Sequence, residues 1–572
     1  MADSTVDNRV ISEKTGQAIE KDLRQIAVSI STGASPTALD NAYTAMLDGT
    51  NTSRIFRLWW PLSAGEGVTK YARLERWFNL LAAAWSHKTY TLRYYNADVS
   101  TSDEMTPLDD LANYASPAAL ATDVDDGGDD WAEEDPMTWY IRANALSLAD
   151  GTMDVLAIEG IDGAFDIYGN TAPVYTFSLA LWRREYGDEG YNYKSWCTTQ
   201  RGGYYPYAGD VAPDDTKRIM TWHPSFGGGL NADGKLTSGI GWYPCNLTSA
   251  STGLTKARLW DAYEGLWNDC DSQWALDMWQ LRHWNLENGN VAEGCVSYSV
   301  QKPIAREETD VSRVIMSQVD GALYELDSCV CVGDPGSNVD HDRNNAYMRN
   351  VVAITHIVSK EDVEIDGITY TALNLACDPI TTTTTTYVST MPWKRGTTEA
   401  LPGHRDGSIR NITNGHFPLR VAGVELLDGA YAIGLDPLYN VTANAEGGFD
   451  YDVYECRDSE NLSSSISSNY IKTGIGVKGL TSGWHYVKEF VKTKLGVLFP
   501  KAFGGGSAAY LKSAFRGAYS AGVRCPWRWG TLTDGGYGGL ACEAGNYAPS
   551  TSSWSGVPRL GGSGKKRGEW AA

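Results

Sequence analysis

Residues 503–570 read FGGGSAAYLKSAFRGAYSAGVRCPWRWGTLTDGGYGGLACEAGNYAPSTSSWSGVPRLGGSGKKRGEW, and this stretch decides how the C-terminal part of the chain folds. Its dense glycine disfavours regular helices and strands, because glycine loses more conformational freedom on folding than any other residue. Tryptophan, tyrosine, serine and asparagine stand between the glycines, whereas a disordered tail would have few aromatic side chains. We therefore expect a folded domain of irregular loops whose flat and polar side chains suit a binding surface.

The composition of the whole chain excludes several classes of protein. Its 572 residues are enough for several domains, and a hydrophobic content of 42% excludes global disorder. The formal net charge of -22 would repel a polyanion, so we expect no nucleic-acid partner. The first residues, MADSTVDNRVISEKTGQ, include no apolar signal segment, and no run reaches the ~20 apolar residues of a membrane span. We therefore expect synthesis in a cytoplasm and no membrane insertion.

The first fifty residues show one amphipathic pattern. Ile19, Leu23, Ile26 and Ile30 recur at helical spacing, which predicts a short helix with one apolar face. Such a helix either packs on its own domain or forms a brief coiled-coil seam at a symmetry axis. We assign residues 1–50 to a helical segment for attachment or oligomerisation.

Residues 51–299 combine helical and strand patterns, and we assign them to a mixed α/β domain. A helix is expected at residues 72–81 and another at about 259–286, where apolar residues recur at steps of three or four. Carboxylates between these apolar positions predict a solvated face: Asp261, Glu264, Asp271 and Asp277. Alternating patterns predict strands at 90–94, 139–142 and 174–182.

Residues 300–385 are expected to form a small β module. Asp-Gly and Asp-Pro-Gly turns alternate there with short apolar runs at 311–316, 351–357 and 370–375. The threonine run 381–386 is either an edge strand or an extended connector, and we place a boundary there. Residues 386–572 form the last domain. The chain as a whole is therefore expected to be an α+β multidomain protein.

No catalytic or metal-binding motif is visible in the sequence. The patterns HExxH, GxSxG and GxxxxGK[ST] do not occur. The acidic stretch 123–130 lacks a side-chain ligand at the fifth position of a calcium loop, and Asn345 replaces the glycine required after 340–344. We expect no catalytic residue, no metal and no cofactor. No pair of carboxylates for glycoside cleavage is indicated, although 70 acidic residues make a chance pair easy.

Two groups of segments in the last domain carry a resemblance. The first group is FPLRVAGVE at 417–425 and GAYAI at 429–433. The second group is FRGA at 515–518, WRWG at 527–530, GGLA at 538–541, APS at 548–550 and RL at 559–560. These segments resemble the C-type-lectin-type fold that formylglycine-generating enzymes share with the variable proteins of diversity-generating retroelements. The resemblance implies a C-type-lectin-type ligand-binding domain at 386–572.

The resemblance implies this fold without enzymatic activity. Formylglycine-generating enzymes use two closely spaced cysteines, whereas Cys525 and Cys542 lie far apart in this sequence. In the retroelement proteins, the residues between framework positions are the diversified ones. With Trp527 as a core residue, carry-over by position gives nine ligand-binding positions: Trp529, Thr531, Thr533, Asp534, Tyr537, Asn546, Tyr547, Ser553 and Ser555. Arg528 is the alternative to Trp529, and Val557 is a further alternative.

The resemblance also implies a function. The chain looks like a bacteriophage receptor-binding protein at the tip of a tail fibre, in which a diversifiable surface mediates host adhesion. Its partners would be a host-cell surface protein or glycan and other phage structural proteins, and it would sit in the virion as a homotrimer. Two alternatives remain, a tailspike depolymerase with its site in residues 55–299 and a head-decoration protein with the same display domain.

Overall fold

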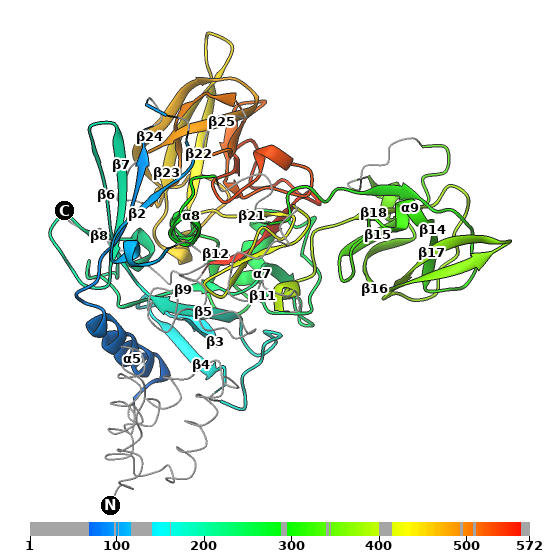
Figure 1. The fold of residues 1–572 in the computed structure, drawn as a ribbon, viewed down its shortest axis with the longest axis horizontal. Coiled ribbons are helices and arrows are strands. Elements are labelled where there is room, and N and C mark those ends of the chain that lie inside the picture. The colour runs from blue at the N-terminus through cyan, green and yellow to red at the C-terminus, as the bar shows by residue number, and fades with distance from the viewer. Residues whose placement is uncertain are drawn as a thin grey trace, which may run out of the picture.

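The computed structural model describes residues 68–96, 99–100, 102–115, 140–160, 162–287, 294–338, 343, 345–399, 415–491, 496–506 and 511–561. Of these residues 40% lie in strands and 14% in helices, and the strands form many small sheets (Figure 1). The α-helices of these ranges are α5 (Lys70–Ala84), α7 (Ala250–Ala257), α8 (Asp269–His283) and α9 (Gln318–Gly321). The expected α+β fold, from the mixed α/β middle region to the C-type-lectin-type C-terminal domain, is therefore wrong, because the chain is mainly β.

Three expectations fall on segments outside the described residues. They concern the N-terminal helix within residues 1–50, the acidic stretch 123–130 and most of the segment 340–344. Within the described ranges, no helix is both long enough and apolar enough to cross a bilayer.

Two antiparallel sheets make up most of the region before residue 260. The first has the strand order β2-β1-β7-β6-β8. Its strands are β1 (Tyr90–Tyr95), β2 (Thr106–Asp109), β6 (Trp182–Asp188), β7 (Tyr191–Cys197) and β8 (Tyr205–Pro206). The second has the order β4-β3-β5-β9. Its strands are β3 (Tyr140–Ser147), β4 (Met153–Ile158), β5 (Val174–Leu179) and β9 (Met220–Pro224).

Two further sheets make up the C-terminal region. The larger has the order β26-β25-β27-β30-β29-β21-β31. Its strands are β21 (Tyr431–Ile433), β25 (Gly483–Phe490), β26 (Pro500–Phe503), β27 (Ala514–Gly517), β29 (Trp527–Arg528), β30 (Glu543–Ala544) and β31 (Gly556–Pro558). The smaller, of order β24-β23-β22-β28, consists of β22 (Pro437–Ala443), β23 (Phe449–Glu455), β24 (Ile471–Leu480) and β28 (Gly522–Arg524).

Three two-stranded sheets accompany these larger sheets. They are β10 (Gly228–Leu230) with β11 (Leu236–Ser238), β12 (Gly265–Leu266) with β32 (Leu560–Gly561), and β19 (Leu419–Val421) with β20 (Val424–Leu426). The pair β12–β32 joins residues almost three hundred positions apart, so it is invisible to local sequence patterns.

The local predictions of helix and strand were right where one period continues without interruption. The helix expected at 72–81 is confirmed as α5, and the strands expected at 90–94, 139–142 and 174–182 correspond to β1, β3 and β5 with the start of β6. In α5 the buried side chains recur at the helical spacing that the sequence showed, whereas β5 is buried on both faces.

The helix expected at about 259–286 is shorter than predicted. Only α8 is helical there, because β12 precedes it and pairs with β32. A Cβ at Gly561 would stand 2.0 Å from the carbonyl oxygen of Leu266, so this close approach of two backbones requires glycine. The predicted solvated acidic face is also wrong, since Glu264, Asp271 and Asp277 are buried.

The regions on either side of residues 300–390 share one hydrophobic core. A single cluster of buried apolar residues extends from Tyr71 in α5 through Trp279 in α8 to Ala541. Arg559 near the C-terminus donates hydrogen bonds to the carbonyl oxygens of Glu425 at 2.7 Å and Pro224 at 2.8 Å. In the described residues, the expected domains 51–299 and 386–572 therefore pack as one body.

A six-stranded sheet of residues 301–390 projects from this body (Figure 1). It has the order β13-β18-β15-β16-β17-β14. Its strands are β13 (Gln301–Pro303), β14 (Arg313–Ser317), β15 (Cys329–Gly333), β16 (Val352–Ile365), β17 (Ile368–Leu375) and β18 (Tyr387–Thr390). The three strands predicted here correspond to β14, β16 and β17. The threonine run 381–386 is a connector that leads into β18.

Candidate functional site

One face of the seven-stranded sheet is the strongest candidate for a functional site. β25 and β27 pair antiparallel, so that Trp484 lies opposite Arg516 and His485 lies opposite Phe515. Because side chains alternate along a strand, these two pairs point to opposite faces of the sheet. Phe515 is buried in an apolar cluster with Val487, so its face is the inner one. Trp484 and Arg516 therefore belong to the outer face.

Tyr537 covers part of this outer face. It is the last residue of a short 3-10 helix, η10 (Gly535–Tyr537), and its ring stacks on that of Trp484 with centroids 5.2 Å apart and planes 5° from parallel. Tyr486, two residues further along β25, has its ring centroid 5.3 Å from that of Tyr537. The three half-buried rings form one patch, and aromatic pairs of this kind contribute about 0.5–1.5 kcal/mol beyond their buried area.

Arg516 connects this patch to two further tyrosines. Its guanidinium lies 5.5 Å from the ring centroid of Trp484 and 5.7 Å from that of Tyr519, a side chain that is 59% exposed. One of its terminal nitrogens donates to the hydroxyl of Tyr547 at 3.4 Å. We name the combined patch the display surface and define it by six residues: Trp484, Tyr486, Arg516, Tyr519, Tyr537 and Tyr547.

The display surface lies on a rigid base. The ring of Tyr547 stacks on the buried indole of Trp527 with centroids 4.0 Å apart. Trp527 in turn lies directly on β31, where a Cβ at Gly556 would stand 2.4 Å from the indole. Only glycine permits this close approach of ring and backbone. Aromatic side chains held in this way lose little conformational entropy when they bind a ligand.

Four of the nine positions predicted to contact a ligand are interior. Trp529 is 1% exposed and packs edge-on against Trp267, with ring centroids 4.9 Å apart. The Asp534 carboxylate accepts a hydrogen bond from the backbone N–H of Thr531 at 2.7 Å, and so closes a loop. Thr531 and Ser555 are buried as well. Here the prediction is corrected, because a ligand at the surface does not reach these four side chains.

The other five predicted positions reach the surface. Thr533 is exposed, and Tyr537, Asn546, Tyr547 and Ser553 are half-buried. Tyr537 and Tyr547 belong to the display surface itself. Arg528 and Val557, the two alternative positions that the resemblance suggested, both lie in the interior. Of the predicted positions, only these five are therefore accessible to a ligand at the surface, and their role in binding stays a prediction.

Sequence reasoning missed four residues of the display surface: Trp484, Tyr486, Arg516 and Tyr519. The alternation of Trp484 and Tyr486 along one strand was a visible signal, because two large aromatics two residues apart share a face of a sheet. Their meeting with Arg516 was not visible, since it depends on the register between β25 and β27.

The chemistry of this region suits non-covalent binding. Burial raises the pKa of Tyr486 and of Tyr547, so both phenols stay protonated at neutral pH and remain able to donate hydrogen bonds. Burial also raises the pKa of Cys525 to about 12, which keeps this thiol from acting as a nucleophile at neutral pH. Among the described residues, no three His, Cys, Asp or Glu side chains group closely enough to hold a metal ion.

Comparison with other proteins assigns no family. No family model matches the chain, and no curated protein sequence matches it either.

Proposed function

We propose that this chain is a phage receptor-binding protein whose display surface binds a protein or glycan on the host cell. One observation carries the proposal, namely the continuous patch of five aromatic rings around Arg516 on strands that a core holds in place. Tryptophan, tyrosine and arginine are the residues that dominate binding energy at protein interfaces. Binding to such a patch requires no covalent step.

Diversification of this surface is the second part of the proposal. The framework residues Trp527, Leu540 and Leu560 are buried, whereas positions between them in the sequence, such as Thr533 and Tyr537, reach the surface. A fixed backbone that carries replaceable side chains lets one fold sample many ligands. We assign the diversified positions to the surface subset: Thr533, Tyr537, Asn546, Tyr547 and Ser553.

The place of the protein in the particle completes the proposal. At the tip of a tail fibre, the display surface points toward the host cell while residues 1–50 attach the chain to the virion as a homotrimer. A head-decoration protein with the same surface would differ in location, which immunogold labelling of particles measures. An assay for oligosaccharides released from cells separates the other alternative, because a tailspike depolymerase would release them and a receptor-binding protein would not.

A cell-binding assay tests the display surface directly. Fluorescently labelled full-length protein is mixed with a panel of bacterial strains, and bound protein is measured by flow cytometry. Replacing both Trp484 and Tyr537 by alanine is expected to weaken binding at least about 100-fold, because each central aromatic contributes roughly 2 kcal/mol or more.

Tyr347→Ala serves as the matched control, since this tyrosine is also exposed but lies in the projecting sheet of residues 301–390. It is expected to bind cells as wild type does. Thermal unfolding of all variants is measured in parallel to show that they fold. Wild-type binding by a folded Trp484→Ala/Tyr537→Ala variant would contradict the proposal.

A further inference from the structure

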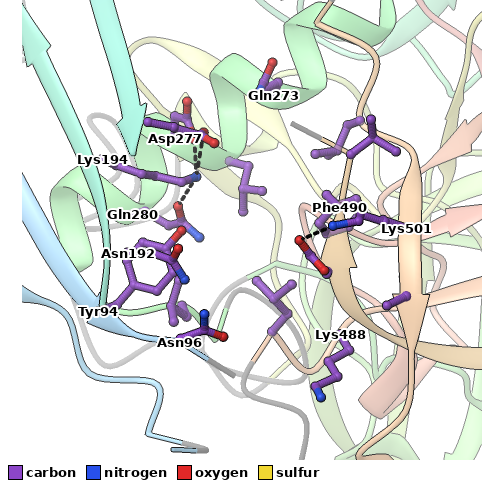
Figure 2. A pocket seen from close by; sticks show the side chains of 18 residues that line it. Tyr94, Asn96, Asn192, Lys194, Gln273, Asp277, Gln280, Lys488, Phe490 and Lys501 are labelled. Atoms are coloured by element: carbon purple, nitrogen blue, oxygen red, sulfur yellow. Dashed lines mark hydrogen bonds and ion pairs between the residues drawn. The ribbon is translucent and has the colours of Figure 1, made fainter. Parts of the chain in front are cut away.

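A cavity of about 530 Å³ lies between two walls of the molecule (Figure 2). One wall consists of β1, β7 and α8, and the other of β25 and β26. Its size falls within the range of roughly 300–1,000 Å³ that is typical of small-molecule sites. No residue of the display surface lines it. The cavity is therefore a second candidate site, independent of the first.

The first wall is the inner face of the five-stranded sheet. Asn192 and Lys194 alternate along β7 and so share a face, and the register places them opposite Tyr94 and Leu92 of β1. Asn192, Lys194 and Tyr94 all line the cavity. The sheet thus presents an aromatic ring, an amide and an ammonium group side by side (Figure 2).

A buried ion pair closes the floor of the cavity. The ammonium of Lys194 donates to the Asp277 carboxylate at 2.6 Å and to the side-chain oxygen of Gln280 at 2.7 Å (Figure 2). Asp277 also accepts from the hydroxyl of Tyr207 at 2.9 Å. Burial alone would raise the pKa of Asp277, but the charges of Lys194 and Arg183 hold it below its usual value. The floor is therefore ionised and fixed in position.

Two buried amides on α8 keep unused hydrogen-bonding capacity. Gln273 is 8% exposed, and its side chain forms no hydrogen bond with the described residues. Gln280 is 1% exposed, and its amide nitrogen donates to none of them. Both residues line the cavity. Neither amide belongs to the buried polar atoms that lack a partner, so their unbonded atoms are open to the cavity and can bond to water or to a ligand that displaces it.

The charges around the cavity balance one another. Among the described residues that line it, three are lysines and three are carboxylates: Lys194, Lys488, Lys501, Glu185, Asp277 and Glu489. Lys501 pairs with Glu489 at 2.8 Å across the second wall. The described lining residues thus carry no excess positive charge for a phosphate or carboxylate, which argues for an uncharged ligand.

We propose that this cavity binds a short neutral saccharide. A sugar hydroxyl both donates and accepts hydrogen bonds, and the amides of Asn192, Gln273 and Gln280 offer both functions as well. Tyr94 and Phe490 lie on opposite walls of the cavity and provide aromatic surface for the C–H groups of a sugar (Figure 2). The fixed ion pair of Lys194 and Asp277 sets the orientation of the hydroxyl groups nearest the floor.

Titration of the full chain with defined sugars tests the site. The probes are maltose, cellobiose, lactose and diacetylchitobiose, with glucuronic acid and glucose 6-phosphate as charged counterparts, each measured by calorimetry and by saturation-transfer NMR. At least one neutral disaccharide is expected to bind with a Kd below about 10 mM. Gln273→Ala is expected to weaken that binding about 10-fold, because one buried hydrogen bond is lost.

A second variant and two controls complete the experiment. Ala502→Trp places an indole in the cavity from β26 and is expected to abolish binding, whereas Gln318→Ala on the remote helix α9 leaves it unchanged. The display-surface variant Trp484→Ala is expected to bind the sugar as wild type does. Three results would each overturn the proposal: no neutral probe binds, both cavity variants bind normally, or the charged probes bind more tightly than the neutral ones.

Discussion

Glu264 is a carboxyl group enclosed in the protein interior. It accepts hydrogen bonds from the backbone N–H of Ser147 at 2.7 Å and from the hydroxyl of Tyr175 at 2.8 Å. Burial is the largest influence on this group and raises its pKa to about 7. Near neutral pH the side chain therefore has to ionise in the interior, at a cost in stability.

We predict that Glu264→Gln flattens the pH dependence of stability. The pKa of Glu264 is raised in the folded protein above the unfolded value of 4.5. Below pH 4.5 the carboxyl is protonated in both states, and the stability that this protonation gives is fully present. As pH rises through about 7, that stability is lost because the folded protein must then hold a buried charge. Urea unfolding at about pH 5 and about pH 7.5 should show that wild type loses roughly 2–3 kcal/mol more than the variant.

A matched replacement separates this effect from a general effect of removing charge. Glu446→Gln changes an exposed glutamate in a hairpin and should keep the wild-type pH slope. If Glu264→Gln and wild type lose stability equally over this range, Glu264 does not ionise in the folded protein as we infer.

The error about Glu264 shows a limit of prediction at this scale. Spacing alone placed it with Asp271 and Asp277 between apolar positions, which favoured a solvated face. Its actual neighbours, Ser147 and Tyr175, come from β3 and β5, about a hundred residues earlier in the chain. Burial depends on which segments pack together, and no local period contains that information.

At the scale of elements, Arg528 connects α8 to the seven-stranded sheet. This buried side chain on β29 contacts Asp269 at the start of α8 at 2.5 Å and Glu543 on β30 at 2.8 Å. It also donates to the carbonyl oxygen of Leu498 at 2.6 Å. One guanidinium thus contacts two interior carboxyl groups and connects the helix to the sheet.

We predict that Arg528→Leu destabilises the protein by about 3–5 kcal/mol, because the two carboxylates remain buried without their cation. Arg306→Leu removes a half-buried arginine of the projecting sheet that pairs with the exposed Asp366 and bonds to the hydroxyl of Tyr370, and it should change stability by less than about 1.5 kcal/mol. Chemical unfolding measures both. A loss at Arg528 as small as that at Arg306 would mean that the ion-pair network contributes little.

Helices and strands could be predicted where apolar residues recur at one regular spacing. They could not be predicted where two segments far apart in the sequence pair with each other. The helix α5 and the strands β1, β14 and β17 follow from their own residues. The strand β12 does not, since it exists only through β32. The same holds for the candidate site, where Tyr537 and Tyr547 were found from framework spacing but Arg516 depends on strand register.

For the whole molecule, the projecting sheet of residues 301–390 is the most separable part. It has a core of its own, which includes Val314, Val330 and Leu373. Its two ends meet, since the N–H of Thr390 donates to the carbonyl oxygen of Val300 at 3.0 Å. A core of this kind is sufficient for a domain of roughly 90 residues to fold alone.

We therefore predict that residues 299–391 expressed alone fold cooperatively. The expected result is a dispersed amide NMR spectrum and a single unfolding transition in urea. Residues 415–561 expressed alone are the comparison and should not fold, because their core is completed by α5 and α8. An unfolded 299–391 fragment would show that the sheet needs the body.

The pairing of β12 with β32 has a consequence for inheritance. A recombination that replaced only the C-terminal half would bring in a β32 without its β12 and an Arg528 without its Asp269. Selection would therefore keep the gene segments that encode the two halves of the chain together. Under the proposed function, new binding specificity would arise by point changes at surface positions, since exchange of whole segments between lineages would break the interior that both halves build.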